Sequence, residues 1–494
     1  MKKRITISNT FFSLILQIVT IISGFIIPRL LLKTFGSEVN GLVSSLNQFL
    51  NYITLIEGGI TAVILANLYK PLAEKNMEKI NGIVAVTNRF FKKIAFIFLG
   101  YTLILSILYP IIIKSSFSFE YISTLTLILS INLFVQYYLS LTWKVLLQAD
   151  KKIAFISIVQ IICLILNTLS VAIMIKKVPN IHLVKLVTSF IFLIQPLSYH
   201  LYIKKHYDIN KNVEPNKNAL SQRWSGFGIN IAAFIHNNTD IIIISLILSL
   251  TDVSVYSVYF LVVEGLKRLI TSISYGIVPT LGHAYASGNV KKTNAVFDAY
   301  EIIIFFATYI LFTAGFILIT PFVQVYSLGV TDANYYQPIL GYFLILAEMT
   351  FCLREPYVNM AYSANKFKEV SKFAYIEAIL NITISILLVY KYKIIGVAIG
   401  TFISMAYRTI MHIIYLKTNV LYRPLSKSFI KIGLFTLLQI FIIIICNKTL
   451  VFDDISLIGW IIYAIKVTTI VIFSYLILSL IFKKNIKKVL KLLK

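Results

Sequence analysis

Residues 227–249 read FGINIAAFIHNNTDIIIISLILS, a hydrophobic segment that begins just before the midpoint of the chain. The segment is long enough to cross a bilayer as a helix, and Asp240 stands near its centre. An aspartate at the centre of a membrane helix costs roughly 2.5 to 3.5 kcal/mol when it faces lipid. We therefore expect Asp240 to face a protein interior or a water-filled cavity.

The composition extends this expectation to the whole chain. Of its 494 residues, 58% are hydrophobic and only 13% are charged, and the mean hydropathy is +0.84. The apolar runs are continuous over about 20 residues, which predicts an all-α polytopic membrane protein. The formal net charge of +26 is spread over short loops, which disfavours nucleic-acid binding. The sequence contains no nucleotide-binding, metal-binding or catalytic motif, so we expect neither an enzyme nor a cofactor.

Windows of about 20 residues predict about 14 transmembrane helices. Their ranges are 8–32, 42–69, 90–113, 121–147, 153–175, 181–203, 224–249, 253–283, 295–320, 335–363, 369–389, 394–416, 429–447 and 455–482. Lys and Arg are concentrated in alternate loops and in both tails, which places both termini in the cytoplasm.

A weak internal repeat predicts the domain organisation. A shift of 214 residues aligns 35–40 with 249–254 and 68–73 with 282–287, and the polarity of the aligned residues matches. Because six helices separate the copies, the repeat is parallel, about an axis along the membrane normal, and a substrate cavity is expected between the bundles. The expected parts are an N-terminal six-helix bundle at 1–203, a cytoplasmic linker at 204–223, a second bundle at 224–417, and helices 13 and 14 with a basic tail at 418–494.

Several short motifs resemble those of a known transporter group. They are GSEVNGL at 36–42, EGGI at 57–60, LYKPLA at 68–73, NTDIII at 238–243, VYSVY at 255–259 and PTLG at 279–282. Together they resemble the Wzx-type polysaccharide or O-antigen flippases of the multidrug/oligosaccharidyl-lipid/polysaccharide (MOP) exporter superfamily. The resemblance implies two parallel bundles, as in the MATE exporters of that superfamily, with a C-terminal helix pair.

The resemblance also implies a function. It implies translocation of undecaprenyl-diphosphate-linked oligosaccharide across the bacterial cytoplasmic membrane by alternating access, for surface polysaccharide biosynthesis. A proton or sodium ion would be the coupling ion, and a polymerase and glycosyltransferases would be partners. The alternatives are a cation-coupled multidrug or small-molecule exporter of the same superfamily, and a scaffold that transports nothing. The basic residues in the helices argue against the drug exporter, and the repeat argues against the scaffold.

Basic residues inside the helices are candidates for binding the diphosphate, because Arg and Lys pair with phosphate oxygens. The candidates are Arg29, Lys267, Arg268 and Arg354. Arg29 and Arg268 are favoured because the first and eighth helices of the related lipid II flippases contribute cavity arginines. The alternatives are snorkelling of Arg29 to the membrane surface, and intrahelical pairing of Lys267 and Arg268 with Glu264, which leaves one surplus positive charge. Structural pairing is the alternative for Arg354. Lys185, Arg408 and Lys466 lie toward helix ends or in peripheral helices, and snorkelling is expected for most of them.

Interior acids and amides are candidates for ion coupling or for polar contacts with the substrate. The candidates are Asp240, Asn237, Asn238, Glu57, Glu264 and Glu348. Asp240 and Glu348 resemble positions at which cation-coupled members of the superfamily carry acids. The alternative for each is a structural ion pair or a hydrogen-bonded polar cluster.

Overall fold

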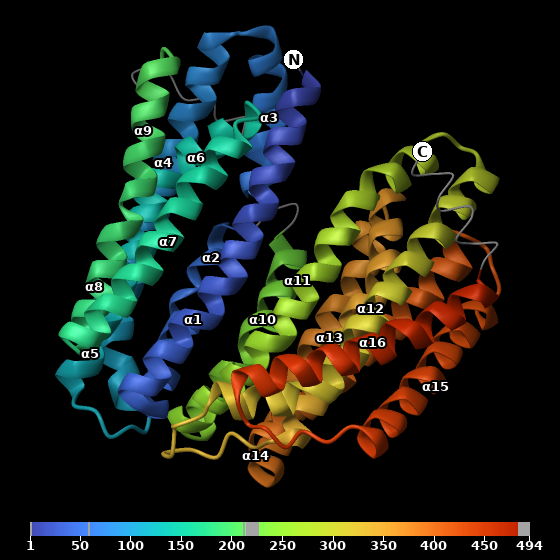
Figure 1. The fold of residues 1–494 in the computed structure, drawn as a ribbon. Helices are drawn as coiled ribbons and strands as arrows, with labels where there is room; N and C mark the ends of the chain where they lie inside the picture. The colour runs from blue at the N-terminus through green and yellow to red at the C-terminus, as the bar shows by residue number, and fades with distance from the viewer. Residues whose placement is uncertain (1, 58–59, 211–212, 214–226, 483–494) are drawn as a thin grey trace. The chain divides into compact units, whose positions relative to one another are not determined.

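All the secondary-structure elements in the described part of the chain are helices. The computed structural model describes residues 2–57, 60–210, 213 and 227–482 (Figure 1). Within them, nine helices are long and apolar enough to cross a membrane. Within the described residues, the 14 predicted segments fall largely on helices, although 42–69, 121–147 and 181–203 are each divided among more than one. The predicted all-α polytopic membrane fold is confirmed. Residues 211–212 and 214–223 of the predicted linker lie outside the described residues.

The helices before the linker form a long series joined by short turns. They are α1 (Lys2–Leu50), α2 (Ile53–Glu57), α3 (Ile60–Glu74), α4 (Met77–Ile112), α5 (Phe119–Val135), α6 (Leu141–Ala149), α7 (Ile153–Lys177), α8 (Ile181–Phe192) and α9 (Ile194–His206), with a π-helical turn at Gln136–Ser140. Polar side chains cap several starts: Asn76 accepts a hydrogen bond from the main-chain N–H of Lys79, and Ser118 from that of Tyr121.

The helices after the linker are fewer and longer. They are α10 (Phe227–Ile247), α11 (Leu250–Ala286), α12 (Val290–Tyr326), α13 (Pro338–Ser363), α14 (Phe367–Asn419), α15 (Ser426–Thr449) and α16 (Leu457–Ile481). Figure 1 shows the run from α11 to α16 coloured from green to red. Neither α11 nor α13 is among the nine strongly apolar helices, and each carries charged residues near its middle.

Two pairs of predicted helices are joined without a loop. Helix α1 continues through Gly36, where the backbone has φ 82° and ψ 178°, a conformation open mainly to glycine. Helix α14 is interrupted at Lys393, where φ is 50°. The predicted boundaries at 32/42 and 389/394 are therefore single-residue breaks instead of loops. One residue outside the helical region is enough to redirect a helix axis.

The chain divides into two compact units, which are described separately. The first comprises Met1–Phe234 and Leu248–Ser254, and the second comprises Ile235–Ile247 and Val255–Lys494. Inside the first unit, Asn40 Nδ2 donates a 2.7 Å hydrogen bond to Ser254 Oγ, and both residues are buried. These are equivalent positions under the 214-residue shift. Gly41 packs so closely beside them that a Cβ atom there would lie 1.7 Å from the Leu250 carbonyl oxygen.

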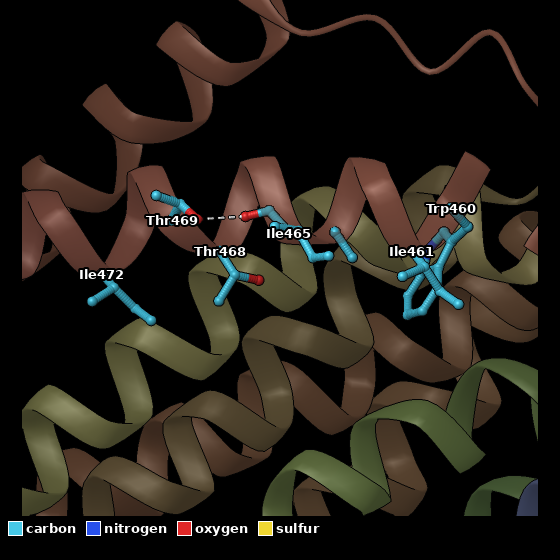
Figure 2. Close-up of a pocket in the computed structure, with 7 residues that line it drawn as sticks. Trp460, Ile461, Ile465, Thr468, Thr469 and Ile472 are labelled. Carbon is cyan, nitrogen blue, oxygen red and sulfur yellow. Dashed lines mark hydrogen bonds between the residues drawn. The ribbon is translucent and has the colours of Figure 1, made fainter. Parts of the chain in front are cut away.

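The C-terminal helices α15 and α16 pack on α12 within the second unit. Tyr309 OH lies 2.8 Å from Thr436 Oγ1 of α15, and Thr313 Oγ1 lies 3.1 Å from Tyr475 OH of α16. The outer face of α16 forms an open hollow of about 330 Å³ lined by Trp460, Ile461, Ala464, Ile465, Thr468, Thr469 and Ile472 (Figure 2). All of these residues come from one helix and most are apolar, so this surface suits contact with lipid chains.

Candidate functional site

The middle of α11 carries an ionic network shared with α13. Lys267 Nζ lies 2.7 Å from Glu264 Oε2 and 3.2 Å from Glu348 Oε2. Lys267 is 6% exposed and Glu348 is 2% exposed. A buried ammonium group needs such partners, because desolvation costs several kcal/mol for an unpaired ion. The network therefore satisfies Lys267 inside the protein.

Arg268 belongs to the same network but points outward. Its Nε lies 3.1 Å from Glu264 Oε1, and 45% of its side chain is exposed. From the sequence, Lys267 and Arg268 were expected to share Glu264 alone, which would leave a surplus positive charge. The structure adds Glu348 to the group, so two cations face two carboxylates. The expected surplus was wrong, because a residue from another helix completes the charge balance.

Asp240 on α10 forms a second buried cluster, with side chains from α11 and α14. Tyr256 OH donates a 2.5 Å hydrogen bond to Asp240 Oδ2, and Thr401 Oγ1 donates one of 2.7 Å to the same oxygen. Asn381 Nδ2 lies 3.5 Å from Asp240 Oδ1. Asp240 is 6% exposed and interacts electrostatically with Lys267. The expectation that this carboxylate faces a protein interior is confirmed.

Arg354 lies in a third cluster, separate from Lys267. Glu377 Oε1 is 3.4 Å from Arg354 Nη1, and Arg408 Nη1 donates a hydrogen bond to Glu377 Oε2. All three residues are at least 90% buried. Arg408 is not one of the basic residues that snorkel, because Glu377 on the neighbouring half of α14 offers a closer partner. The cluster holds two cations and one carboxylate.

The remaining predicted residues lie apart from these clusters. In the first unit, Glu57 accepts hydrogen bonds from Thr61 Oγ1 at 2.8 Å and Tyr137 OH at 3.0 Å, while Arg29 is partly buried on α1. In the second unit, Asn238 is partly buried on α10. The side chain of Asn237 lies outside the described residues.

Several interior charges were not predicted from the sequence. Lys144 on α6 interacts electrostatically with Glu57, and a lysine inside an apolar run was the available signal. Glu301 on α12 is fully buried and accepts hydrogen bonds from Lys431 Nζ and, at 2.5 Å, from Tyr357 OH. Because Glu301 and Lys431 are 130 residues apart, no local pattern reveals this pairing.

A further ion pair lies just beyond the end of α14. Arg423 donates two hydrogen bonds to the Asp298 carboxylate, at 2.7 and 2.9 Å. These bonds raise the pKa of Arg423 above its usual value. With Glu301 and its lysine partners, this pair connects α12 to the segment that leads into α15. The described residues include no group of three or more His, Cys, Asp or Glu that could hold a metal ion.

The architecture has counterparts among solved structures. No family model matches the sequence, and no curated protein matches it significantly. The lipid II flippase MurJ, in its inward closed conformation, superposes with a TM-score of 0.76 at 17% identity, over 97% of this chain and 99% of that chain. An inward-facing multidrug resistance MATE family transporter of the MOP superfamily gives 0.59 at 12% identity, over 83% and 95%. The eukaryotic MATE transporter AtDTX14 gives 0.61 at 13% identity, over 86% and 98%.

These identities support a statement about fold. The matches extend over most of each chain, and the proteins named in them are transporters, not enzymes. The chain is therefore a multi-pass membrane protein whose fold is similar to those of the lipid II flippase MurJ and the MATE transporters.

Proposed function

We propose that this protein is a Wzx-type flippase that moves undecaprenyl-diphosphate-linked oligosaccharide across the bacterial cytoplasmic membrane for surface polysaccharide biosynthesis. The observation that carries the proposal is the position of Arg268. It lies 18 residues from either end of α11, yet nearly half of its side chain is exposed. A guanidinium group at that depth is costly against lipid, so it belongs in a polar path. A diphosphate is a suitable ligand for an exposed guanidinium.

The fold comparison supports a lipid-linked substrate over a drug. The lipid II flippase structure accounts for 97% of this chain, whereas the two MATE structures account for 83% and 86%. The helix arrangement therefore corresponds better to a flippase, because the MurJ structure also matches part of the chain that has no counterpart in the MATE structures. Arg29, Lys267 and Arg354 remain proposed contacts for the diphosphate, and Lys267 and Arg354 would have to exchange carboxylate partners for phosphate during transport.

The Asp240 cluster supports cation coupling. A buried carboxylate with hydroxyl and amide neighbours has the chemistry to take up a proton or a sodium ion. Ion uptake would cancel the charge of the Asp240 carboxylate. Lys267 and Glu348 both interact electrostatically with this carboxylate, so the change would reach them as well. We propose that this exchange shifts the equilibrium between the inward-open and outward-open states of the transporter. Both termini would lie in the cytoplasm. Glycosyltransferases would act before this step, and a polymerase would act after it.

The same cluster favours one other function, a cation-coupled multidrug exporter, since the MATE structures share the fold. The two functions differ in what accumulates when the protein is lost. Loss of a flippase would leave lipid-linked repeat units inside the cell, whereas loss of a drug exporter would raise drug sensitivity.

Deletion in the native host, followed by complementation, tests the proposal. We expect the deletion strain to accumulate lipid-linked repeat units and to lose surface glycan. Arg268→Ala should restore at most about a tenth of the export of the unmodified protein, because a lost charge-assisted contact is worth roughly 1.5 to 3 kcal/mol. Arg89→Ala, at an exposed arginine on α4, is the matched control and should complement fully. Normal surface glycan in the deletion strain, without accumulation, would contradict the proposal.

A further inference from the structure

A polar cluster on α11, α12 and α13 adjoins the ionic networks described above, and its Glu355 carboxylate interacts electrostatically with Arg354. Glu355 Oε2 accepts hydrogen bonds from Ser274 Oγ at 3.0 Å and from Asn359 Nδ2 at 3.1 Å. Asn359 Nδ2 also lies 2.9 Å from Tyr300 OH. Ser274 is buried, whereas Glu355 and Asn359 are partly exposed. The cluster therefore has a closed side, formed by Ser274 and Tyr300, and an open side.

The cluster lies between the same two helices, α11 and α13, as the ionic network that includes Arg268. Lys267 pairs with Glu348, and Ser274 pairs with Glu355, and each pair is separated by 81 residues in the sequence. Helices α11 and α13 therefore lie side by side in a constant register, with two polar rungs. The rungs are seven residues apart on each helix, about 10 Å along the axis. That separation is of the order of a diphosphate and one sugar ring.

The open side of the cluster offers hydrogen-bond acceptors. Among the described residues, no donor is bonded to Glu355 Oε1 or to Asn359 Oδ1, because the hydrogen bonds of this cluster use Glu355 Oε2 and Asn359 Nδ2. A carboxylate accepts strong, charge-assisted hydrogen bonds, and an amide oxygen accepts two. Vicinal hydroxyl groups of a sugar are donors that match such a pair.

An exposed aromatic ring stands beside these acceptors. Tyr275 is 74% exposed, and it interacts electrostatically with Glu355. It follows Arg268 by seven residues, so the two side chains lie on the same face of α11. An aromatic ring provides a flat apolar surface for the C–H face of a sugar, while its hydroxyl group stays hydrated.

We propose that Tyr275, Glu355 and Asn359 form a glycan subsite, which holds the sugar next to the diphosphate while Arg268 holds the diphosphate itself. The inference rests on the proposed flippase function and adds the part of the substrate that this surface reads. The glycan subsite selects for a sugar that presents hydroxyl donors on one face. It thereby separates recognition of the glycan from recognition of the lipid diphosphate.

Binding to the purified full-length protein tests the subsite, with ligands that differ only in the sugar. The probes are undecaprenyl diphosphate and its conjugates with glucose, galactose and N-acetylglucosamine, and the measurement is the Kd of each by thermophoresis in detergent. For the unmodified protein, at least one conjugate should bind about tenfold more tightly than undecaprenyl diphosphate. Tyr275→Ala and Glu355→Ala should each remove most of that difference and change the Kd of undecaprenyl diphosphate less than about twofold. Arg268→Ala should weaken all four ligands.

Two further variants separate recognition from damage to the fold. Tyr390→Ala removes a tyrosine that is 73% exposed on α14 and should leave every Kd unchanged. Glu355→Gln keeps an acceptor oxygen, so it should retain part of the preference for the conjugate.

Two results would overturn the glycan subsite. One is equal binding of undecaprenyl diphosphate and all three conjugates to the unmodified protein. The other is a sugar preference that survives Tyr275→Ala and Glu355→Ala. Failure of all four ligands to bind would instead contradict the proposed function on which the inference rests.

Discussion

Replacing Glu377 with alanine is expected to destabilise the protein by roughly 3 to 5 kcal/mol, because it removes the carboxylate shared by Arg354 and Arg408. Both guanidinium groups are buried, and Arg408 Nε already has no hydrogen-bond partner among the described residues. Thermal unfolding of the purified protein in detergent measures the loss as a lower melting temperature.

Two controls identify the cause of this loss. Glu369→Ala removes a half-exposed carboxylate of the same helix, 3.3 Å from Lys366, and should leave the melting temperature unchanged. Combining Glu377→Leu with Arg354→Met and Arg408→Met should restore most of the stability, because a well-packed apolar set avoids the desolvation cost. An unchanged melting temperature for Glu377→Ala would contradict the buried triad.

Gly41→Ala is the second substitution with a large expected effect. The added Cβ would lie 1.7 Å from the Leu250 carbonyl oxygen and 3.2 Å from the Ser254 nitrogen, and both are backbone atoms that cannot rotate away. Overpacking usually costs about 1 to 3 kcal/mol, and a clash with backbone belongs at the upper end or above it. The adjacent hydrogen bond between Asn40 and Ser254 should be lost as well. We expect poor yield and a lower melting temperature.

Other helical glycines provide the matched controls. A Cβ at Gly100 on α4 or at Gly433 on α15 would meet nothing within 4 Å. Alanine at these positions should be neutral or slightly stabilising, because it favours a helix more than glycine does. If Gly41→Ala behaves like these two substitutions, the close approach at Leu250 is wrong.

Hydrophobic run length was enough to locate the helices, because a bilayer imposes a minimum apolar length on each one. Run length could not show how neighbouring helices join. The predicted helices left residues 33–41 between them as a connection, but Gly36 redirects the chain in one residue and Gly41 allows a close approach. Lys393 makes a similar single-residue break in α14.

The charged clusters were only partly predictable. Depth in a helix correctly placed Asp240 in a protein interior, because the cost of a lipid-facing carboxylate does not depend on its neighbours. The pairing of Lys267 with Glu264 was predicted from their spacing on one helix, and the structure shows it. Glu348 and Glu377 could not be predicted as partners of Lys267 and Arg354, because they reach them from other helical segments. Such pairings depend on how neighbouring helices are aligned along their axes. That alignment cannot be deduced from the local sequence of either helix.

Glu301 shows the same limit. It was not considered as an interior charge, although its neighbours Lys417 and Lys431 come from the end of α14 and the start of α15. Only the folded helices bring these groups together. The resemblance of short motifs to the MOP exporters indicated the correct fold. The proposed Wzx-type function is defined by the substrate that the protein moves, and the fold does not specify that substrate.

Reconstitution of the purified protein with a defined substrate tests the flippase proposal most directly. Vesicles would carry undecaprenyl-diphosphate-linked oligosaccharide confined to the inner leaflet, and a sugar-specific enzyme added outside would report its arrival in the outer leaflet. We predict rapid exposure of the glycan in vesicles that contain the unmodified protein, and exposure at least about tenfold slower with Arg268→Ala. Exposure no faster than in protein-free vesicles, from protein shown to be folded and inserted, would contradict the account.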